Sequence, residues 1–348
     1  MRRVAPSTEK GPLVPHSENI EQPQSLSLVN QRPSLSASTA AEWLARDWGF
    51  QMDVRALESE RDQNWMASVD GEPRLVLKVA NAGEDPAVLE LQQVMLARAR
   101  AAGLPCPEVV HTRSCGSTAS WDGNLGWVIT ALPGRKLADE PLPSTDLWNH
   151  LGTVLGRLAI VLAEVEHPAA HRWLQWDVVN AEEVLATYRS SIVGARRGEI
   201  ADAVLAQFRD LVVPVIDDLP RSLIHNDAND HNILVQGDRV SGLIDFGDAL
   251  HTVTVNELAI ACSYAMLGRA EPREVAQAIT RGYEAQRELS QLEREVLPVL
   301  IRTRLAMSVS ISAYQQTLEP DNPYLRISEQ PAWDLLERLM EETADGHD

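Results

Sequence analysis

The residues best suited to chemistry in this 348-residue chain lie together between Leu223 and Asp248. That segment contains a His-x-Asp motif, an Asn five residues after the Asp, and an Asp-Phe-Gly motif. Transfer of a phosphoryl group from a nucleotide needs a carboxylate that takes up a hydroxyl proton. It also needs an amide and a second carboxylate as oxygen ligands for Mg2+. The order and spacing of the motifs therefore predict a phosphoryl-transfer site in this segment.

Each polar residue of the segment has an expected role in such a site. Asp227 is predicted to be the general base, which orients and deprotonates the acceptor hydroxyl. Asn232 and Asp245 are predicted to bind Mg2+, and Asp245 also approaches the nucleotide phosphates. His225 is expected to brace the loop, and Gly247 to permit a tight backbone turn.

Two other interpretations of the loop sequence HNDANDHN, residues 225–232, stay open at this point. The loop is rich in residues that form Asx turns, so it could be only a polar connection between strands. Its two His and two Asp could also form a divalent-metal site, although it lacks the recurring spacings of zinc ligands. Phosphoryl transfer is favoured because a predicted hairpin over residues 233–244 would bring Asp245 back beside Asn232.

A second candidate lies in the first third of the chain. Lys78 is one of only three lysines among 31 basic residues, and it falls in the strand-like run LVLKVA. It is predicted to bind α- and β-phosphate oxygens of the nucleotide, held in place by a carboxylate from the next helix. Glu90 is the candidate for that carboxylate. The alternative is a solvent-facing lysine on an edge strand.

The loop ESERDQN, residues 58–64, lies where a nucleotide-covering loop is expected. Because it contains no glycine, contacts to the phosphates are predicted from the side chains of Ser59, Arg61 and Asn64 as well as from backbone amides. An ordinary polar turn is the alternative.

The acceptor side of the site is less well marked. Asp248 and Glu257 follow the Asp-Phe-Gly motif, and either could bind an amine-bearing acceptor. Glu257 could equally be a charge on a helix surface or between lobes. Four tryptophans could line a cation pocket or pack in the core; they are Trp121, Trp148, Trp173 and Trp176.

The chain length and composition predict an α+β protein with two lobes. Residues 1–35 are rich in Pro, Ser, Gln and Glu and are predicted to be a disordered tail. Residues 36–134 are predicted to form a nucleotide-binding N-lobe with a five-stranded sheet and one long helix. Residues 135–348 are predicted to form a helical C-lobe that carries the catalytic and substrate-binding residues. The break between the lobes is placed at Pro133-Gly134.

Hydrophobic periodicity and turn residues predict the individual elements. A short helix is expected to begin at Ser38-Thr39, with Glu42 completing a capping box and Gly49 ending the helix. The expected strands are 54–58, 64–71, 73–81, 109–114 and 126–132. The expected helices are 86–102, 145–166, 180–191, 199–217, 254–268, 272–288, 291–317 and 331–342.

The net charge of −19 argues against a nucleic-acid partner, which would need clustered Lys and Arg, and favours a cationic small molecule. No apolar run approaches the length of a membrane span, and the N-terminus lacks the apolar core of a secretory signal. Three cysteines without metal-ligand spacing fit a reducing compartment. The expected location is the cytoplasm, with no membrane partner.

The segments LIHNDANDHNILV, GLIDFGD and NELAIACSYAML resemble the aminoglycoside phosphotransferase-like (choline kinase-like) superfamily. Together with ESERDQNW they look most like hydroxylysine kinase and its bacterial relatives, over approximately residues 36–345. The resemblance implies a protein-kinase-like fold and phosphorylation, by ATP or GTP with Mg2+, of a hydroxyl on a small amine or amino acid. It assigns the catalytic base to Asp227, Mg2+ to Asn232 and Asp245, and the nucleotide phosphates to Lys78.

Two departures and two alternatives accompany the resemblance. Asn226 stands where many relatives have Gly, and no Ala-Pro-Glu element follows the Asp-Phe-Gly, which speaks against a protein kinase. Because some bacterial relatives are fused to a class III aminotransferase, a functional link to such an enzyme is expected. The alternatives are a phosphotransferase of the same fold for aminoglycosides or other amino alcohols, and a non-catalytic nucleotide-binding module.

Overall fold

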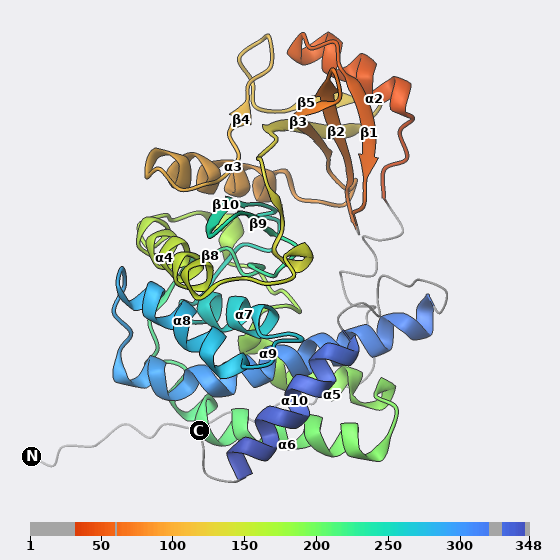
Figure 1. Ribbon diagram of the computed structural model, residues 1–348. Coiled ribbons are helices and arrows are strands. Elements are labelled where there is room, and N and C mark those ends of the chain that lie inside the picture. The colour runs from red at the N-terminus through yellow and green to blue at the C-terminus, as the bar shows by residue number, and fades with distance from the viewer. Residues whose placement is uncertain (1–31, 60, 320–328, 345–348) are drawn as a thin grey trace, which may run out of the picture.

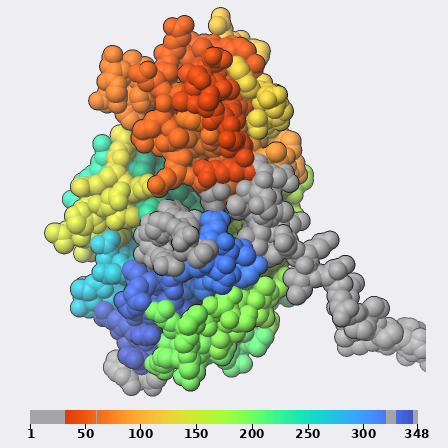
Figure 2. Space-filling view, turned by 90° about the vertical axis from the view of Figure 1, so that its right-hand side faces the viewer, coloured from red at the N-terminus to blue at the C-terminus, as the bar shows by residue number. Residues whose placement is uncertain are grey.

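The computed structural model describes residues 32–59, 61–319 and 329–344. Most of the predicted tail, residues 1–35, lies outside these ranges. An antiparallel sheet region lies at one end of the molecule and a helical region at the other, as Figure 1 shows. In the space-filling view of Figure 2 the N-terminal residues, red to orange, lie at the top, and the C-terminal residues, green to blue, lie at the bottom. The predicted α+β class, with a β-rich N-terminal part and a mostly helical C-terminal part, is confirmed.

The N-terminal sheet has six strands in the order β1-β2-β3-β6-β4, with β5 paired to β6. One of the six was not expected from the sequence. It is β5, whose three residues are too few to show an alternating pattern, and it turns into β6 through Asp122 at φ 48°. The strands are β1 (Asp53–Leu57), β2 (Gln63–Val69), β3 (Glu72–Val79), β4 (Val109–Val110), β5 (Ala119–Trp121) and β6 (Asn124–Thr130).

Each face of the sheet is covered by a helical segment. On one side lie α2 (Ala37–Trp43) and a π-helical turn, Leu44–Trp48; on the other lies α3 (Pro86–Ala101). Side chains of β6 alternate between the two cores, because successive residues of a strand point to opposite faces. Val128 belongs to the core under α2, whereas Trp127 belongs to the core shared with α3.

The start of the first helix differs from the prediction. Ser36 is the N-cap, and its hydroxyl accepts a hydrogen bond from the backbone N–H of Thr39. Thr39 therefore lies inside the helix, so the predicted capping box between Thr39 and Glu42 is wrong. Gly49 ends the segment in a left-handed conformation, φ 80°, as predicted.

The chain enters the helical region by joining a small sheet rather than through a free linker. The order of this sheet is β10-β9-β7, formed by β7 (Arg135–Lys136), β9 (Ile233–Gln236) and β10 (Arg239–Leu243). Gly134 precedes β7 at φ 123°, and a Cβ there would collide with Ser241 and the backbone of Val235. The boundary between lobes at residues 134 and 135 stays a prediction.

The helical region is organised around α9, a long and mostly buried helix. By length and composition α9 could cross a membrane, but 78% of its most apolar window is buried, as in the core helix of a globular protein. Every helix predicted for this part of the chain is present. They are α4 (Thr145–Leu162), α5 (Ala181–Tyr188), α6 (Ala195–Leu211), α7 (Asn256–Ala265), α8 (Pro272–Glu284), α9 (Gln291–Leu318) and α10 (Glu329–Ala344).

Helices α4 and α8 pack closely because glycines lie in their contact. A Cβ at Gly152 would collide with the carbonyl oxygen of Ile279, and a Cβ at Gly282 would collide with that of Asn149. Backbone atoms cannot rotate away from such a contact as a flexible side chain can. The two helices must therefore separate if either glycine gains a side chain.

We expect Gly152→Ala to lower the free energy of unfolding by about 1–3 kcal/mol, the usual cost of overpacking a core. The measurement is the midpoint of urea denaturation. Gly116→Ala is the matched control, because a Cβ there would meet only ordinary contacts, 3.4 Å from Thr112 Oγ1 and 3.5 Å from the Thr118 carbonyl oxygen. Equal midpoints for the two variants would contradict the close approach of α4 and α8.

Candidate active site

Two short pairings place the His-x-Asp loop and the Asp-Phe-Gly segment together. β8 (Arg221–Ile224) leads into the loop and pairs with β11 (Leu250–Val253), which follows the Asp-Phe-Gly motif. Downstream of the loop, β9 and β10 form the predicted hairpin. At its open end the backbone N–H of Ile244 donates to the carbonyl oxygen of Asn232 at 3.0 Å. Asp245 therefore returns beside Asn232.

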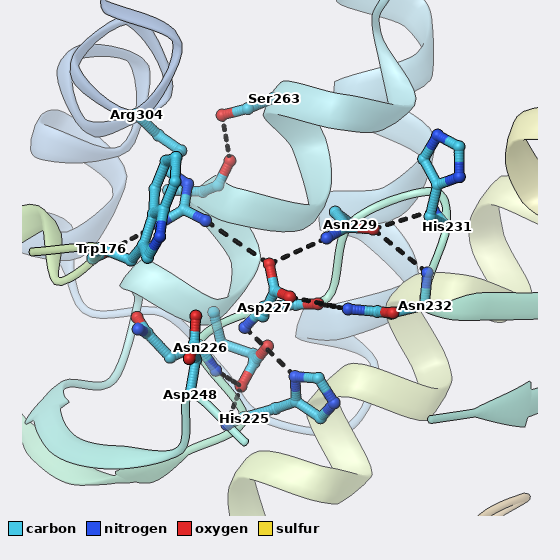
Figure 3. Close-up of polar contacts among 12 residues, drawn as sticks. Trp176, His225, Asn226, Asp227, Asn229, His231, Asn232, Asp248, Ser263 and Arg304 are labelled. Atoms are coloured by element: carbon cyan, nitrogen blue, oxygen red, sulfur yellow. Dashed lines mark hydrogen bonds and ion pairs between the residues drawn. The ribbon is translucent and has the colours of Figure 1, made fainter. Parts of the chain in front are cut away.

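The carboxylate of Asp227 is held by two asparagine side chains (Figure 3). Asn229 Nδ2 donates to its Oδ1 at 2.9 Å, and Asn232 Nδ2 donates to its Oδ2 at 2.7 Å. Asn229 also accepts the backbone N–H groups of His231 and Asn232. The sequence prediction did not single out Asn229, although its place in a run of Asx-turn formers was a signal for this kind of contact.

A buried arginine lies next to the predicted base. Nη2 of Arg304, on α9, is 3.6 Å from Asp227 Oδ1, and Arg304 is only 1% exposed. Burial and the negative charge of Asp248 raise the pKa of Asp227 well above its ordinary value, while Arg304 opposes the shift. The arginine therefore favours the ionised form of Asp227, which a proton acceptor needs.

Arg304 is fixed by aromatic groups as well as by charge. Its Nη1 donates to the carbonyl oxygen of Trp176 at 2.5 Å, and its guanidinium lies 4.8 Å from the Trp176 ring centroid and 5.6 Å from that of Tyr264. The cation that Trp176 contacts is thus the guanidinium of Arg304, a group of the protein itself. No sequence pattern pointed to Arg304, because it lies 77 positions beyond Asp227 in a helix whose pattern is apolar.

The backbone of the loop is anchored from α7. Glu257 Oε2 accepts the N–H groups of His225 at 2.6 Å and Asn226 at 3.4 Å. Glu257 is 1% exposed, so the expectation that it binds the acceptor is corrected: it faces the protein interior. Burial raises the pKa of Glu257 to about 7, against the opposing effect of the two hydrogen bonds.

His225 occupies a bracing position. Its Nδ1 accepts the backbone N–H of Asp227 at 3.1 Å, and its Nε2 lies 3.0 Å from the carbonyl oxygen of Ile244. Burial lowers the pKa of His225 to about 4, so the ring is neutral and Nε2 carries the proton that bonds Ile244. The His225 and Phe246 rings are in edge contact, with centroids 4.4 Å apart. His225 therefore ties the catalytic loop to the Asp-Phe-Gly segment.

The tight backbone turn in the Asp-Phe-Gly segment lies at a different residue from the one expected. Gly247 does not adopt a positive φ; Asp245 does, at 64°. The reason is that Asp tolerates the left-handed region better than most residues. A Cβ at Gly247 would meet only ordinary contacts, 3.5 Å from Asp245 Oδ1 and 3.9 Å from Arg61 Nη2, so close packing does not require glycine there either.

Lys78 reaches the same place from the N-terminal sheet. It is 7% exposed, and its Nζ donates to Asp245 Oδ1 at 3.0 Å. Burial lowers the pKa of Lys78, but the carboxylates of Asp245 and Asp62 outweigh it and the net shift is upward. The attraction of Lys78 in turn lowers the pKa of Asp245 to about 2.

The expected partnership of Lys78 with Glu90 is not present. The Glu90 side chain is 72% exposed on α3, and its nearest ionic partner is His167, with 4.0 Å between Glu90 Oε2 and His167 Nε2. The second carboxylate near Lys78 belongs to Asp62, just before β2. Its Oδ1 accepts the backbone N–H of Asn81 at 3.1 Å.

Two of the three residues predicted to contact nucleotide phosphates, Arg61 and Asn64, lie next to the site. Arg61 Nη2 bonds Asp248 Oδ1 at 2.5 Å, which joins the sheet region to the helical region. Asn64 is the cross-strand neighbour of Lys78, and its buried Oδ1 has no hydrogen-bond partner among the described residues. Ser59 lies half-buried at the start of the loop. Asp248, expected on the acceptor side, is 6% exposed.

The oxygen atoms around Asp227 fit a Mg2+ ion that also binds nucleotide phosphates. Asn232 uses its Nδ2 for Asp227 and so leaves Oδ1 available, and the Asp245 side chain is half exposed. Within residues 32–59, 61–319 and 329–344, no group of three or more His, Cys, Asp or Glu could hold a metal. The Asn232 amide oxygen and the Asp245 carboxylate are hard oxygen ligands of the kind that Mg2+ prefers, so the residues present fit this ion.

With this geometry in place, the comparisons with known proteins are decisive. Residues 53–296 match the phosphotransferase enzyme family. The chain belongs to this family. The resemblance predicted from the motifs is thereby confirmed, and the protein is an enzyme that transfers a phosphoryl group to a hydroxyl of a small molecule.

Individual relatives agree with the family. The chain is 28% identical to hydroxylysine kinase of Mus musculus over 90% of this chain and 92% of that one. It is 26% identical to homoserine kinase of Methylobacillus flagellatus, over 88% and 93%. Among solved structures, a microcompartment-associated aminopropanol kinase aligns with a TM-score of 0.69 and 18% identity, over 89% and 99%. The structural match confirms the predicted kinase-like fold.

The buried position of Glu257 predicts a pH-dependent stability. Its pKa in the folded protein, about 7, lies above the ordinary value of 4.5, so the folded state holds the proton more tightly than the unfolded state. The wild type should therefore lose up to about 3 kcal/mol of stability, relative to Glu257→Gln, as the pH rises from 4.5 to 7. Urea denaturation at a series of pH values measures this. Glu288→Gln, at a side chain 86% exposed, is the matched control.

The contact between Arg304 and Asp227 predicts a catalytic defect that is separate from nucleotide binding. Arg304→Met leaves Asp227 without its nearest cation and the Trp176 carbonyl without its donor. We expect kcat to fall about 10–100-fold, as for loss of a group that holds a catalytic acid or base in its active state. The KM for nucleotide should change less than threefold. A kcat equal to that of the wild type would contradict the role.

Proposed function

We propose that the enzyme transfers the γ-phosphate of ATP or GTP to the hydroxyl of a small hydroxylated amine or amino acid. The observation that carries the proposal is the meeting of Lys78, Asp245, Asn232 and Asp227 around one position. The relatives support the acceptor class, because hydroxylysine, homoserine and aminopropanol each carry both a hydroxyl and an amine.

In the proposed reaction, Lys78 binds nucleotide phosphate oxygens and Asp227 receives the hydroxyl hydrogen bond of the acceptor. The acceptor oxygen forms a bond to the γ-phosphorus as the bond between that phosphorus and the β–γ bridging oxygen breaks. Asp227 takes the hydroxyl proton, and the nucleoside diphosphate leaves. Mg2+, held by Asn232 and Asp245, supplies charge neutralisation on the phosphates when it is bound.

The nucleotide-covering loop contributes the remaining phosphate contacts in this proposal. Arg61 and Asn64 are directed toward the site, and Ser59 lies at its margin. Glu90 is left out of the nucleotide site because of its exposed position. His225 keeps a structural role through its hydrogen bonds, whereas Gly247 has neither a positive φ nor a close contact that would require glycine.

We also propose that the enzyme works in the cytoplasm and binds neither nucleic acid nor membrane. The net charge of −19 disfavours both polyanionic partners. All three cysteines are free thiols, two of them buried, as expected in a reducing compartment. The functional link to a class III aminotransferase stays a prediction.

An acceptor panel tests the proposed function. The panel contains hydroxylysine, homoserine, 1-amino-2-propanol, ethanolamine and an aminoglycoside, each with ATP or GTP and Mg2+, and product formation is measured with γ-labelled nucleotide. We expect turnover on at least one of the first three compounds. Turnover confined to the aminoglycoside would favour the antibiotic-modifying alternative. Nucleotide binding without turnover on any compound would favour a non-catalytic module.

Asp227→Asn separates chemistry from binding. The substitution keeps the size of the side chain and removes the charge that accepts the proton, so we expect kcat to fall by about 100-fold or more. Nucleotide affinity should stay within threefold of wild type, as measured by calorimetry with AMP-PNP. Asp217→Asn, at a side chain 98% exposed, is the control for the same chemical change. Turnover near the wild-type rate in Asp227→Asn would contradict the role of Asp227 as the general base.

A further inference from the structure

One side chain in the catalytic loop has no part in the mechanism above. Asn226 is fully buried, and neither its Oδ1 nor its Nδ2 has a hydrogen-bond partner among the described residues. A buried polar atom without a hydrogen-bond partner destabilises the folded protein. The position therefore carries a destabilising group directly beside the catalytic base.

The backbone conformation of Asn226 would favour glycine at this position. Asn226 adopts φ 65°, in the left-handed region, where glycine is unstrained and other residues are disfavoured. A glycine would relieve the backbone and would remove both unpaired atoms. The chain instead holds a carboxamide there, with its backbone N–H donating to Glu257 at 3.4 Å. Stability alone does not account for the side chain.

The surroundings of Asn226 indicate what the carboxamide can bind. In Figure 3 its side chain is directed away from the Asp227 carboxylate, on the side of the loop where Asp248 lies. Asp248 is buried and now bonds a cationic group, the guanidinium of Arg61. A carbonyl oxygen and a carboxylate are both hydrogen-bond acceptors, and together they suit a group with several N–H donors and a positive charge.

We propose that Asn226 and Asp248 form the subsite for the ammonium group of the acceptor. Asn226 Oδ1 and the Asp248 carboxylate are its hydrogen-bond acceptors, and the adjacent Asp227 then faces the hydroxyl of the same molecule. This inference rests on the proposed function and makes Asn226 a specificity-determining residue. It selects for amines over neutral alcohols of the same shape.

Arg61 gives the subsite a connection to the nucleotide. Arg61 belongs to the nucleotide loop, and its guanidinium pairs with Asp248 Oδ1. Nucleotide phosphates compete with Asp248 for this guanidinium, because they carry more negative charge. When the nucleotide binds, Asp248 exchanges Arg61 for the acceptor ammonium. Arg172, which donates to the carbonyl oxygens of Gly247 and Ala249, holds the segment in place during the exchange.

Asn226→Gly gives a sharp test, because the two explanations of Asn226 predict opposite changes. If Asn226 binds the acceptor, the variant should be as stable as the wild type or more so. Its KM for the amine acceptor should rise about 10-fold or more, with the KM for ATP unchanged and kcat within threefold. For the N-acetylated form of the same acceptor, which lacks the positive charge, wild type and variant should have equal kcat/KM.

The control is Asp122→Gly, which makes the same kind of change at an exposed left-handed residue, φ 48°, in the turn between β5 and β6. It should leave every kinetic constant unchanged. An unchanged KM for the amine in Asn226→Gly would overturn the proposal, and would indicate that Asn226 binds only a buried water. An equal loss on the amine and its N-acetyl derivative, with reduced thermal stability, would indicate a structural role instead.

A binding measurement keeps this inference separate from the proposed function. Calorimetric titration of the amine into wild type and Asn226→Gly, both with AMP-PNP and Mg2+, needs no turnover. Weaker binding to the variant supports the subsite even if no phosphorylated product forms, in which case only the proposed function fails. If no amine of the panel binds the wild type, the subsite is overturned. Titration without nucleotide should show weak binding to the wild type and tighter binding to Arg61→Gln.

Discussion

The position of the catalytic base depends on a buried carboxylate that lies behind it. Glu257 accepts the backbone N–H groups of His225 and Asn226, the two residues immediately before Asp227. Both N–H groups point into the protein and have no water to bond, so a buried acceptor is required. Because the loop turns at Asn226 with a positive φ, its backbone groups cannot be satisfied by a neighbouring strand. The rigidity of the site begins at this contact, which lies in the protein interior because Glu257 is buried.

A second constraint joins the two regions of the molecule through charge. Lys78 of the sheet forms an ion pair with Asp245 of the helical region. Arg61 and Asp248 form a second ion pair between the same two regions. Each ion pair neutralises charges that would otherwise repel a ligand or one another inside a partly buried site. Both cations are groups that nucleotide phosphates attract. Under the proposed function, a bound nucleotide would therefore act on two of the contacts between the sheet and the helical region.

Sequence patterns predicted those parts of the site that lie close together in the chain. His225, Asp227, Asn232 and Asp245 fall within one loop and one hairpin, where local spacing determines geometry. The patterns failed for residues whose neighbours are determined by packing between distant parts of the chain. Glu90 has the right helix but the wrong face, and Asp62 approaches Lys78 instead because cross-strand register places it there. Arg304 had no signal, since a buried arginine in an apolar helix is recognisable only from what surrounds it.

The departures from expectation share a physical cause, which is that each buried charge must find its partner within the fold. Glu257 turned inward because two backbone N–H groups needed an acceptor, and Arg304 lies beside Asp227 because a buried carboxylate needs a cation to remain ionised. Asn226 differs from them, since neither polar atom of its buried amide has a hydrogen-bond partner among the described residues. A fully buried amide with both polar atoms unpaired is best explained by a partner that arrives with the substrate. The carbonyl oxygen of this amide is thus the part of the loop that gains its hydrogen bond only in the complex.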